Sequence, residues 1–194
     1  MVYESCLGEW TKDRFSLHTH KRSGTNMKPT HTDVHDRNIR IVSMRQPWWH
    51  AISKLGKNVE NRTTPAKWLN GKTGWIVILE SKGKPPPKEV ALMCRQSGIA
   101  PTPPQVRSLH KRGQEIVGMM RIKSHNKGNL PSHICDSPWY MGHHAWEILD
   151  VFPFKQSIRG PHDEPIKGSQ CTARRLHNIL HHDLIVERIL DEII

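Results

Sequence analysis

The chain has 194 residues, of which 36% are hydrophobic and 24% charged, and its 29 Lys and Arg against 18 Asp and Glu give a formal net charge of +11. This length suits one well-buried domain with tails and is short for two domains of ordinary size. No run approaches the roughly 18 apolar residues of a membrane-spanning helix, and the four cysteines are scattered without a CxxC pair, which argues against a zinc ribbon or a disulfide framework. We therefore expect an intracellular protein, cytoplasmic or nuclear, with free thiols and no membrane partner.

The excess positive charge is confined to residues 39–171, because the segments before and after them are nearly neutral. A basic folded segment favours a polyanionic partner such as nucleic acid more than a basic tail does. The same excess can serve solubility alone, so charge by itself leaves both interpretations open.

The first elements are predicted from composition and turn residues. Residues 1–38 are rich in Ser, Thr, His and charge without periodicity, which predicts a disordered or loosely packed leader. A strand is expected at IRIVSM, 39–44, where β-branched residues alternate with others. Pro47 and Gly56 suit the start and the stop of a short helix, PWWHAISKL. The polar segment KNVENR, 57–62, is expected as an edge strand or an extended loop.

The central segment alternates between strands and helices. The apolar run GWIVILES predicts a buried strand, and proline-rich starts predict two helices. Two further strands are separated by a long loop of a kind that is often functional or mobile. This order predicts an α+β domain built around a mixed sheet or small barrel. The ranges are 74–81 for the buried strand, 85–98 and 101–113 for the helices, 114–125 and 145–154 for the strands, and 126–144 for the loop.

The end of the chain, LHNILHHDLIVERILDEII, places its apolar residues near helical spacing, and we assign an amphipathic helix to 177–194. Packing on the domain is the commonest origin of such an apolar face. Dimerisation and docking of a protein partner are the alternatives.

Three charged residues follow Gly56 in the pattern G-K-x-x-E-x-R: Lys57, Glu60 and Arg62. In an extended segment Glu60 and Arg62 point to one face, while Lys57 lies at the preceding turn, so the three groups can converge. The cations can then bind a phosphate while the glutamate accepts a hydrogen bond from an amine. A solvated strand with an ordinary ion pair would produce the same pattern.

Gln46 and two tryptophans precede this pattern. Gln46 can make paired hydrogen bonds to a base edge, beside the fixed backbone of Pro47. Trp48 and Trp49 diverge on a helix, so one is expected in the core and the other as a partly exposed surface on which a base can stack.

The histidines offer no metal site by their spacing. Of fourteen, two pairs are adjacent in sequence, at 143–144 and 181–182, and adjacent side chains diverge on both strands and helices. No P-loop, H-E-x-x-H or G-x-S-x-G motif occurs. We therefore predict neither a metal nor a cofactor.

The segments VSMRQPWWHAISKLGKNVENRTTPAKW and GWIVILESK together resemble the opening of ASCH domains, the family named after activating signal cointegrator 1 homology. The resemblance continues through the helix at 86–97, IVGMMRI and SPWYMGHHAWEILDVFPFKQSIRG, and covers about residues 39–176. The chain departs from the family at IRGPHDEPIKGSQCTARRL, where a shorter closing strand is usual. The resemblance implies a PUA-like fold, a small mixed β-barrel with flanking helices and a cleft beside the G-K-x-x-E-x-R segment.

The family is associated with nucleic-acid ligands, in transcription coactivation and RNA processing or modification. The resemblance therefore implies that this chain binds single-stranded RNA or DNA, with Lys57, Arg62 and Lys82 holding phosphates. A base would lie near Gln46, Glu60 and a tryptophan. The positions that match the family's cleft are Gln46, Pro47, Lys57, Glu60 and Arg62, with Ser81 and Lys82 beside it and Trp139 and His144 opposite.

The family also contains enzymes, which supply a second hypothesis. Small bacterial relatives hydrolyse acetylated cytidine with a Lys and, three residues on, a Thr nucleophile; here that position is Glu60, which has no hydroxyl. In a ribonuclease, Lys57 would stabilise phosphorane charge while Glu60 or His144 moved protons. We predict a binding module, with a hydrolase of RNA or a modified nucleoside, or a protein adaptor using the C-terminal helix, as alternatives.

Overall fold

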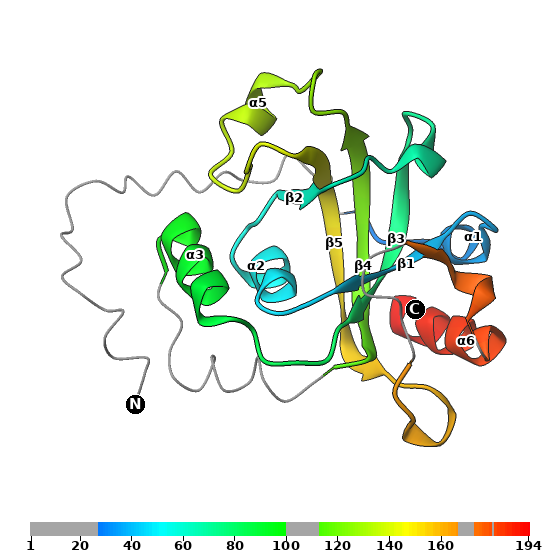
Figure 1. Ribbon diagram of the computed structural model, residues 1–194. Helices are drawn as coiled ribbons and strands as arrows, with labels where there is room; N and C mark the ends of the chain where they lie inside the picture. The colour runs from blue at the N-terminus through cyan, green and yellow to red at the C-terminus, as the bar shows by residue number, and fades with distance from the viewer. Residues whose placement is uncertain (1–26, 100–112, 167–172, 180) are drawn as a thin grey trace, which may run out of the picture.

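A computed structural model describes residues 27–99, 113–166, 173–179 and 181–194. Its centre is one sheet of six strands in the order β2-β5-β4-β3-β1-β6 (Figure 1). β1 and β3 run parallel, and every other neighbouring pair is antiparallel. The strands are β1 (Arg40–Met44), β2 (Val59–Arg62), β3 (Thr73–Glu80), β4 (Glu115–His125), β5 (His144–Ile158) and β6 (Arg174–Arg175).

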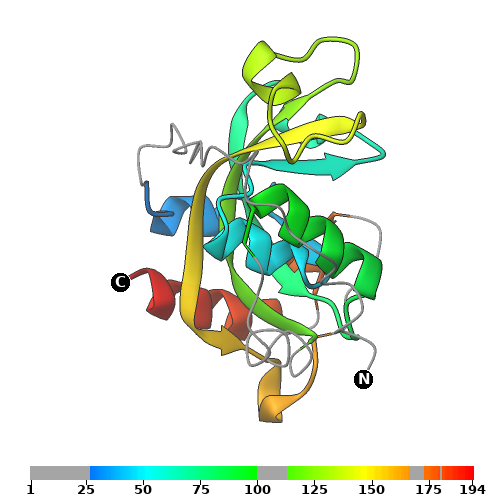
Figure 2. The same cartoon turned by 90° about the vertical axis from the view of Figure 1, so that its left-hand side faces the viewer.

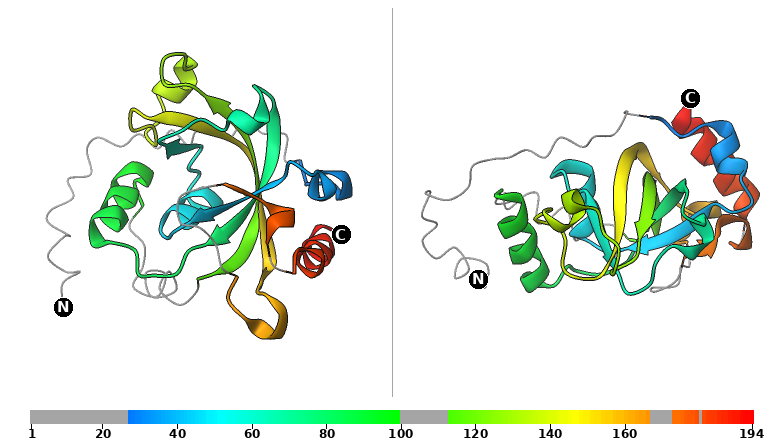
Figure 3. Two further views of the ribbon diagram at one scale, coloured as in Figure 1. Left: turned by 45° about the vertical axis from the view of Figure 1, so that its right-hand side comes forward. Right: turned by 90° about the horizontal axis from the view of Figure 1, so that it is seen from above.

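The sheet curls into a half-barrel with helices on both faces, so the fold is mixed α+β as the sequence predicted (Figure 3). The long strand β5 bends across the height of the molecule (Figure 2). Short helical turns lie between the strands. The helices are α1 (His31–His35), α2 (Trp48–Lys54), α3 (Pro87–Ser97), α5 (Ser132–Cys135) and α6 (His182–Ile193), with turns η2 (Lys67–Leu69), η3 (Pro161–Asp163) and η4 (Leu176–Asn178).

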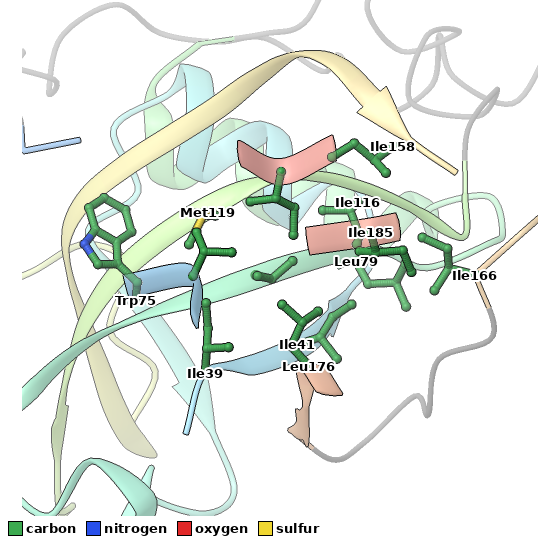
Figure 4. Packing of buried hydrophobic residues seen from close by; sticks show 13 residues of the cluster. Ile39, Ile41, Trp75, Leu79, Ile116, Met119, Ile158, Ile166, Leu176 and Ile185 are labelled. Carbon is green, nitrogen blue, oxygen red and sulfur yellow. The ribbon is translucent and has the colours of Figure 1, made fainter. Parts of the chain in front are cut away.

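The outer face of the sheet packs against α1 and α6. Alternate residues of β1 and β3, such as Ile41 and Val77, meet Val34 of α1 and Ile185 of α6 in one buried cluster (Figure 4). Strand side chains alternate between faces, so the odd-numbered residues of both parallel strands point this way. This face anchors both ends of the described chain.

The inner face of the sheet packs against α2. Val42 and Ile78 are partners in register, and each follows an outward-pointing residue along its strand. Both pack against Trp49 and Ile52 of this helix. The opposite side of α2 contributes Ala51 to a third cluster, which includes residues of α3, α5 and the loop after α5. Thus α2 lies between the sheet and α3 (Figure 1).

The four strands predicted from residues 39–44, 74–81, 114–125 and 145–154 are confirmed as β1, β3, β4 and β5. Segment 57–62 contains β2, which is at one edge of the sheet as expected. β5 extends four residues beyond its predicted end. The helix predicted at 101–113 lies outside the described residues apart from its last position.

Three segments differ from the expectation. The C-terminal helix starts only at His182, because Ile179 is extended and His181 has a left-handed backbone conformation with φ of 59°. The end of the predicted leader, from residue 27, contains α1, whose Val34 is 1% exposed. The loop at 126–144 contains α5, and its residues Ile134 and Trp139 are buried. Residues 1–26 lie outside the described part.

Candidate functional site

The site begins where the two parallel strands end side by side. Met44 and Glu80 are partners in register, and the amide of Ser81 donates to the Met44 carbonyl at 2.9 Å. Gln46 Nε2 then donates to Glu80 Oε1 at 2.9 Å, and both side chains are buried. The Gln46 Oε1 atom accepts from the backbone of His50 at 3.2 Å. Gln46 is therefore engaged in holding α2 against the strand ends.

The two tryptophans diverge as predicted. The Gln46–Pro47 peptide bond is cis, and Pro47 is the N-cap of α2. Trp49 is 6% exposed and belongs to the inner core. Trp48 is half-buried on the other side, and its indole Nε1 donates to Glu89 Oε2 of α3 at 2.9 Å.

The three charged residues after Gly56 meet at β2. Lys57 Nζ lies 3.0 Å from Glu60 Oε2 and also donates to the Val59 carbonyl. Arg62 Nε lies 3.2 Å from Glu60 Oε1, in an ion pair without hydrogen-bond alignment. The Lys57 side chain is only 2% exposed, whereas that of Arg62 is 21% exposed. The predicted convergence is confirmed, but Lys57 points inward and Arg62 is the more accessible cation.

The protonation of this group follows from its burial. Burial lowers the pKa of Lys57 because it disfavours the charged ammonium. The attraction of Glu60 acts in the opposite direction, but the repulsion of Arg62 partly cancels it. Burial alone would raise the pKa of Glu60, but the attraction of Lys57 and Arg62 outweighs it and holds this pKa below its ordinary value. Glu60 is therefore a carboxylate at neutral pH.

Two adjoining cavities open beside this group. The first, of about 500 Å³, lies between the ends of β1 and β3 and the strand β2, and Gln46, Arg62, Ser81 and Lys82 are among its lining residues. The second, of about 510 Å³, lies between β2, α2 and α3 and includes Lys57. The two cavities share four lining residues: Arg45, Trp48, Glu60 and Asn61. We refer to both together as the basic cleft.

Cations dominate the walls of the basic cleft. Among the described residues its acidic lining side chains are Glu60 and Glu89, and Glu89 is already paired with Arg45 at 2.5 Å. Seven basic residues outnumber them, so the cleft carries a positive potential that attracts anions. These are Arg45, Lys57, Arg62, Lys82, Lys84, Lys88 and Arg95.

Three predicted site residues, Pro47, Trp139 and His144, lie outside this lining. Trp139 is 4% exposed and packs in the third core cluster, with Lys57 Nζ 6.0 Å from its ring centroid. His144 is the register partner of Arg62 on β5, and its Nδ1 accepts from the Lys127 backbone at 3.2 Å. Trp139 can therefore help to hold the Lys57 ammonium in place through a cation–π contact. His144 lines neither cavity.

Sequence reasoning missed several lining residues. Arg45 directly precedes Gln46, and Asn61 lies between Glu60 and Arg62. This position next to predicted site residues was the signal that could have found them. The α3 residues Glu89, Lys88 and Arg95 gave no such signal, because only the tertiary packing of α3 beside α2 brings them to the cleft.

Neither a metal centre nor a membrane helix is found in the described part of the chain. His125 and His133 each lie 2.8 Å from the Glu147 carboxylate, yet no three described His, Cys, Asp or Glu side chains are arranged to hold a metal ion. None of the helices described combines the length and the apolar character that crossing a membrane requires.

Comparison with protein-family models and with curated proteins finds no match to this chain.

Proposed function

We propose that this chain is an ASCH domain of the PUA-like superfamily that binds single-stranded RNA or DNA in the basic cleft, with a role in transcription coregulation or RNA processing. The sequence resemblance supports the family. The curled sheet with helices on both faces agrees with a PUA-like barrel. The position of Gln46, Glu60 and Arg62 around one cavity agrees with the site that the resemblance implies.

One observation carries the proposal: a half-buried tryptophan, Trp48, lines both of two adjoining cavities whose walls are rich in cations. Arg62 and Lys82 on one side and Lys88 and Arg95 on the other suit successive phosphates of a strand. Trp48 between them offers a ring for a base, which contributes about 1–3 kcal/mol per stacked base in such sites. The Glu60 carboxylate can accept a hydrogen bond from an exocyclic base amine.

Lys57 takes a different part from the one first expected. Its ammonium is buried and engaged by Glu60 and the Val59 carbonyl. We assign it the task of fixing the Glu60 carboxylate, while phosphate contacts fall to the exposed Lys82 and Lys88 and to Arg62. This division also explains why a lysine is tolerated at such depth, since a buried charge requires a partner.

A hydrolase gains less support from the same geometry. A general base works best with a pKa near the operating pH, and the pKa of Glu60 is shifted the other way. His144, the second proton-transfer candidate, lies outside the cavities. We therefore favour binding without turnover.

The test is a salt series of binding to a fluorescent single-stranded 12-mer, as RNA and as DNA, measured by anisotropy. Each phosphate contact contributes about 0.7 to the slope of log affinity against log salt, so four contacts predict about a 50-fold loss between 50 and 200 mM salt. Replacing two exposed cleft lysines, Lys82→Ala with Lys88→Ala, is expected to reduce that slope by about 1.4.

The matched control removes the same charge elsewhere. Lys123 and Lys155 are exposed and line neither cavity, so Lys123→Ala with Lys155→Ala should leave the slope unchanged. Equal effects of the two double variants, or no binding at 50 mM salt, would remove the proposal. The hydrolase alternative is tested by incubating the 12-mer RNA and acetylcytidine with the wild type and with Glu60→Gln. Faster turnover by the wild type than by the variant would support a hydrolase.

A further inference from the structure

A second group of cations lies at the opposite end of β1 from the basic cleft. β6 pairs with β1 so that Arg175 is directly across from Arg40, and Arg174 is across from Ile41. Arg174 and Arg175 are exposed, and Arg40 is half-buried. Arg40 and Arg175 therefore share the inner face of the sheet, whereas Arg174 points to the other face at the same sheet edge. We call these three residues at the sheet edge the arginine cluster.

The arginine cluster lacks internal neutralisation. Within the described ranges, no carboxylate forms an ion pair with Arg40, Arg174 or Arg175. Like charges directly opposite on paired strands are destabilising. Burial and the charge of Arg175 both lower the pKa of Arg40, and its Nε–H group is buried without an acceptor among those residues. An anion at this position would relieve each of these costs.

A chain of ring contacts connects the arginine cluster with the basic cleft. The guanidinium of Arg40 lies 5.6 Å from the Trp68 ring centroid, and Trp68 meets Trp146 edge-to-face at 5.4 Å. On the far side of Trp146, the Arg62 guanidinium lies 5.0 Å from the ring and lines the first cavity. Cation–π contacts of this length are favourable. Arg40 of the arginine cluster therefore lies on the same inner face of the sheet as Arg62 of the basic cleft.

The spacing between the regions suits one extended ligand. β1 rises about 3.3 Å per residue, so roughly 13 Å separates Arg40 from Met44 at the cavity wall. Trp68, which the Arg40 guanidinium contacts, is half-buried, whereas Trp146 is 4% exposed and belongs to the inner core. Guanidinium groups bind phosphate with two parallel hydrogen bonds, and an accessible indole ring can stack a base.

We infer that Arg40, Arg174 and Arg175, with Trp68, form a second nucleic-acid-binding surface that holds the flank of a single strand seated in the basic cleft. This inference rests on the proposed function and adds to it a preference for longer strands. A ligand of a few nucleotides fills the cleft alone, and a longer one reaches the arginine cluster.

The test compares strand lengths on the full chain. Affinities of fluorescent 4-mer and 12-mer oligothymidylates are measured for the wild type and for Arg174→Ala with Arg175→Ala. These two residues are exposed on an edge strand, so the fold should persist, which circular dichroism checks. We expect the 12-mer to bind about tenfold more weakly to the variant and to lose about 1.4 of its salt slope, while the 4-mer changes by less than about twofold.

Further variants separate the outcomes. Arg174→Lys with Arg175→Lys keeps the charge and should restore most of the salt slope, and Lys123→Ala with Lys155→Ala should alter neither length. If both oligomers bind as well to the alanine variant as to the wild type, the basic cleft stands and this inference falls. If the 12-mer depends on the arginine cluster but not on Lys82 and Lys88, the proposed cleft falls, and with it the inference that the arginine cluster holds the flank of a cleft-bound strand. If binding of a polyglutamate peptide requires the arginine cluster and binding of the 12-mer does not, the assignment of this surface to nucleic acid is wrong.

Discussion

At the scale of single residues, Glu60 determines how the site is organised. It is 8% exposed and faces one cation that is more buried than itself and one that reaches the cavity. A carboxylate between two cations fixes both side chains, so less conformational entropy remains to be lost when a ligand binds. The residue is thus the structural centre of the group that it forms with Lys57 and Arg62.

Glu60→Gln is expected to lower the free energy of unfolding by about 3 kcal/mol at pH 7, because it leaves the buried Lys57 ammonium without its anion. The folded-state pKa of Glu60 lies below its ordinary value of 4.5. Its stabilisation is therefore present above pH 4.5 or so and is lost as pH falls through the folded-state pKa. Urea denaturation at pH 7 and pH 3 should show the difference between wild type and variant narrowing in acid.

Glu187→Gln is the control, since Glu187 is exposed on α6; we expect it to stay within about 0.5 kcal/mol of wild type at both pH values. A Glu60→Gln deficit of equal size at pH 3 would show that the carboxylate charge is not its cause.

The residues of the site were predictable where local backbone dictates the outcome. Glu60 and Arg62 share a face because strand side chains have a period of two, and Ser81 follows a strand whose apolar run was evident. Trp139 in the loop after α5 and His144 at the start of β5 could not be placed this way. Their positions depend on how 126–144 packs against α2 and α3, which no periodicity records.

At the scale of elements, buried strands were the most predictable and short helices the least. β3 is apolar from Trp75 to Leu79 because both of its faces are covered there, so its sequence alone identified it. The five-residue helix α1 is too short to be stable by itself, and contacts with α6 and the sheet maintain it. Apolar spacing at 176–194 also could not reveal the break at His181.

Val34→Ala tests whether the end of the leader belongs to the folded unit. Val34 is 1% exposed in the outer cluster with Ile185 and Ile189, so its truncation leaves a cavity and should cost roughly 2 kcal/mol of unfolding free energy. Chemical denaturation measures this cost. His35→Ala, on the exposed side of α1, should change stability by less than about 0.5 kcal/mol. Equal stability of Val34→Ala and wild type would mean that α1 contributes nothing to the fold.

The C-terminal helix bears on the adaptor alternative. Its buried residues Ile185 and Ile189 pack on the sheet, as the commonest origin of an amphipathic face predicts. A protein partner would have to use the remaining face, where Leu184 is 50% exposed among Asp183, Glu187 and Arg188. Deleting α6 would therefore disturb the core, and substitutions at Leu184 are the appropriate probe of docking.

At the scale of the whole molecule, the two faces of the sheet differ in the residues that they carry. The outer face joins both ends of the described chain in an apolar cluster, and the inner face carries the basic cleft together with Arg40 and Arg175 of the arginine cluster. The chain as a whole carries a formal net charge of +11. Whether that charge acts as a diffuse field or through the cleft residues depends on ionic strength, because the Debye length is about 30 Å at 10 mM salt and about 8 Å at 150 mM.

Association rates separate these two contributions. In stopped-flow binding of the 12-mer at 10 mM salt, both Lys82→Ala with Lys88→Ala and Lys123→Ala with Lys155→Ala should slow association, the latter by about twofold, because remote cations still steer the strand. At 150 mM salt the remote pair, which lines neither cavity, should have little effect, whereas the cleft pair should remain slow. A remote pair that slows association as much as the cleft pair at 150 mM would show that the strand binds the charged surface as a whole, because only contacts within about 8 Å survive that screening.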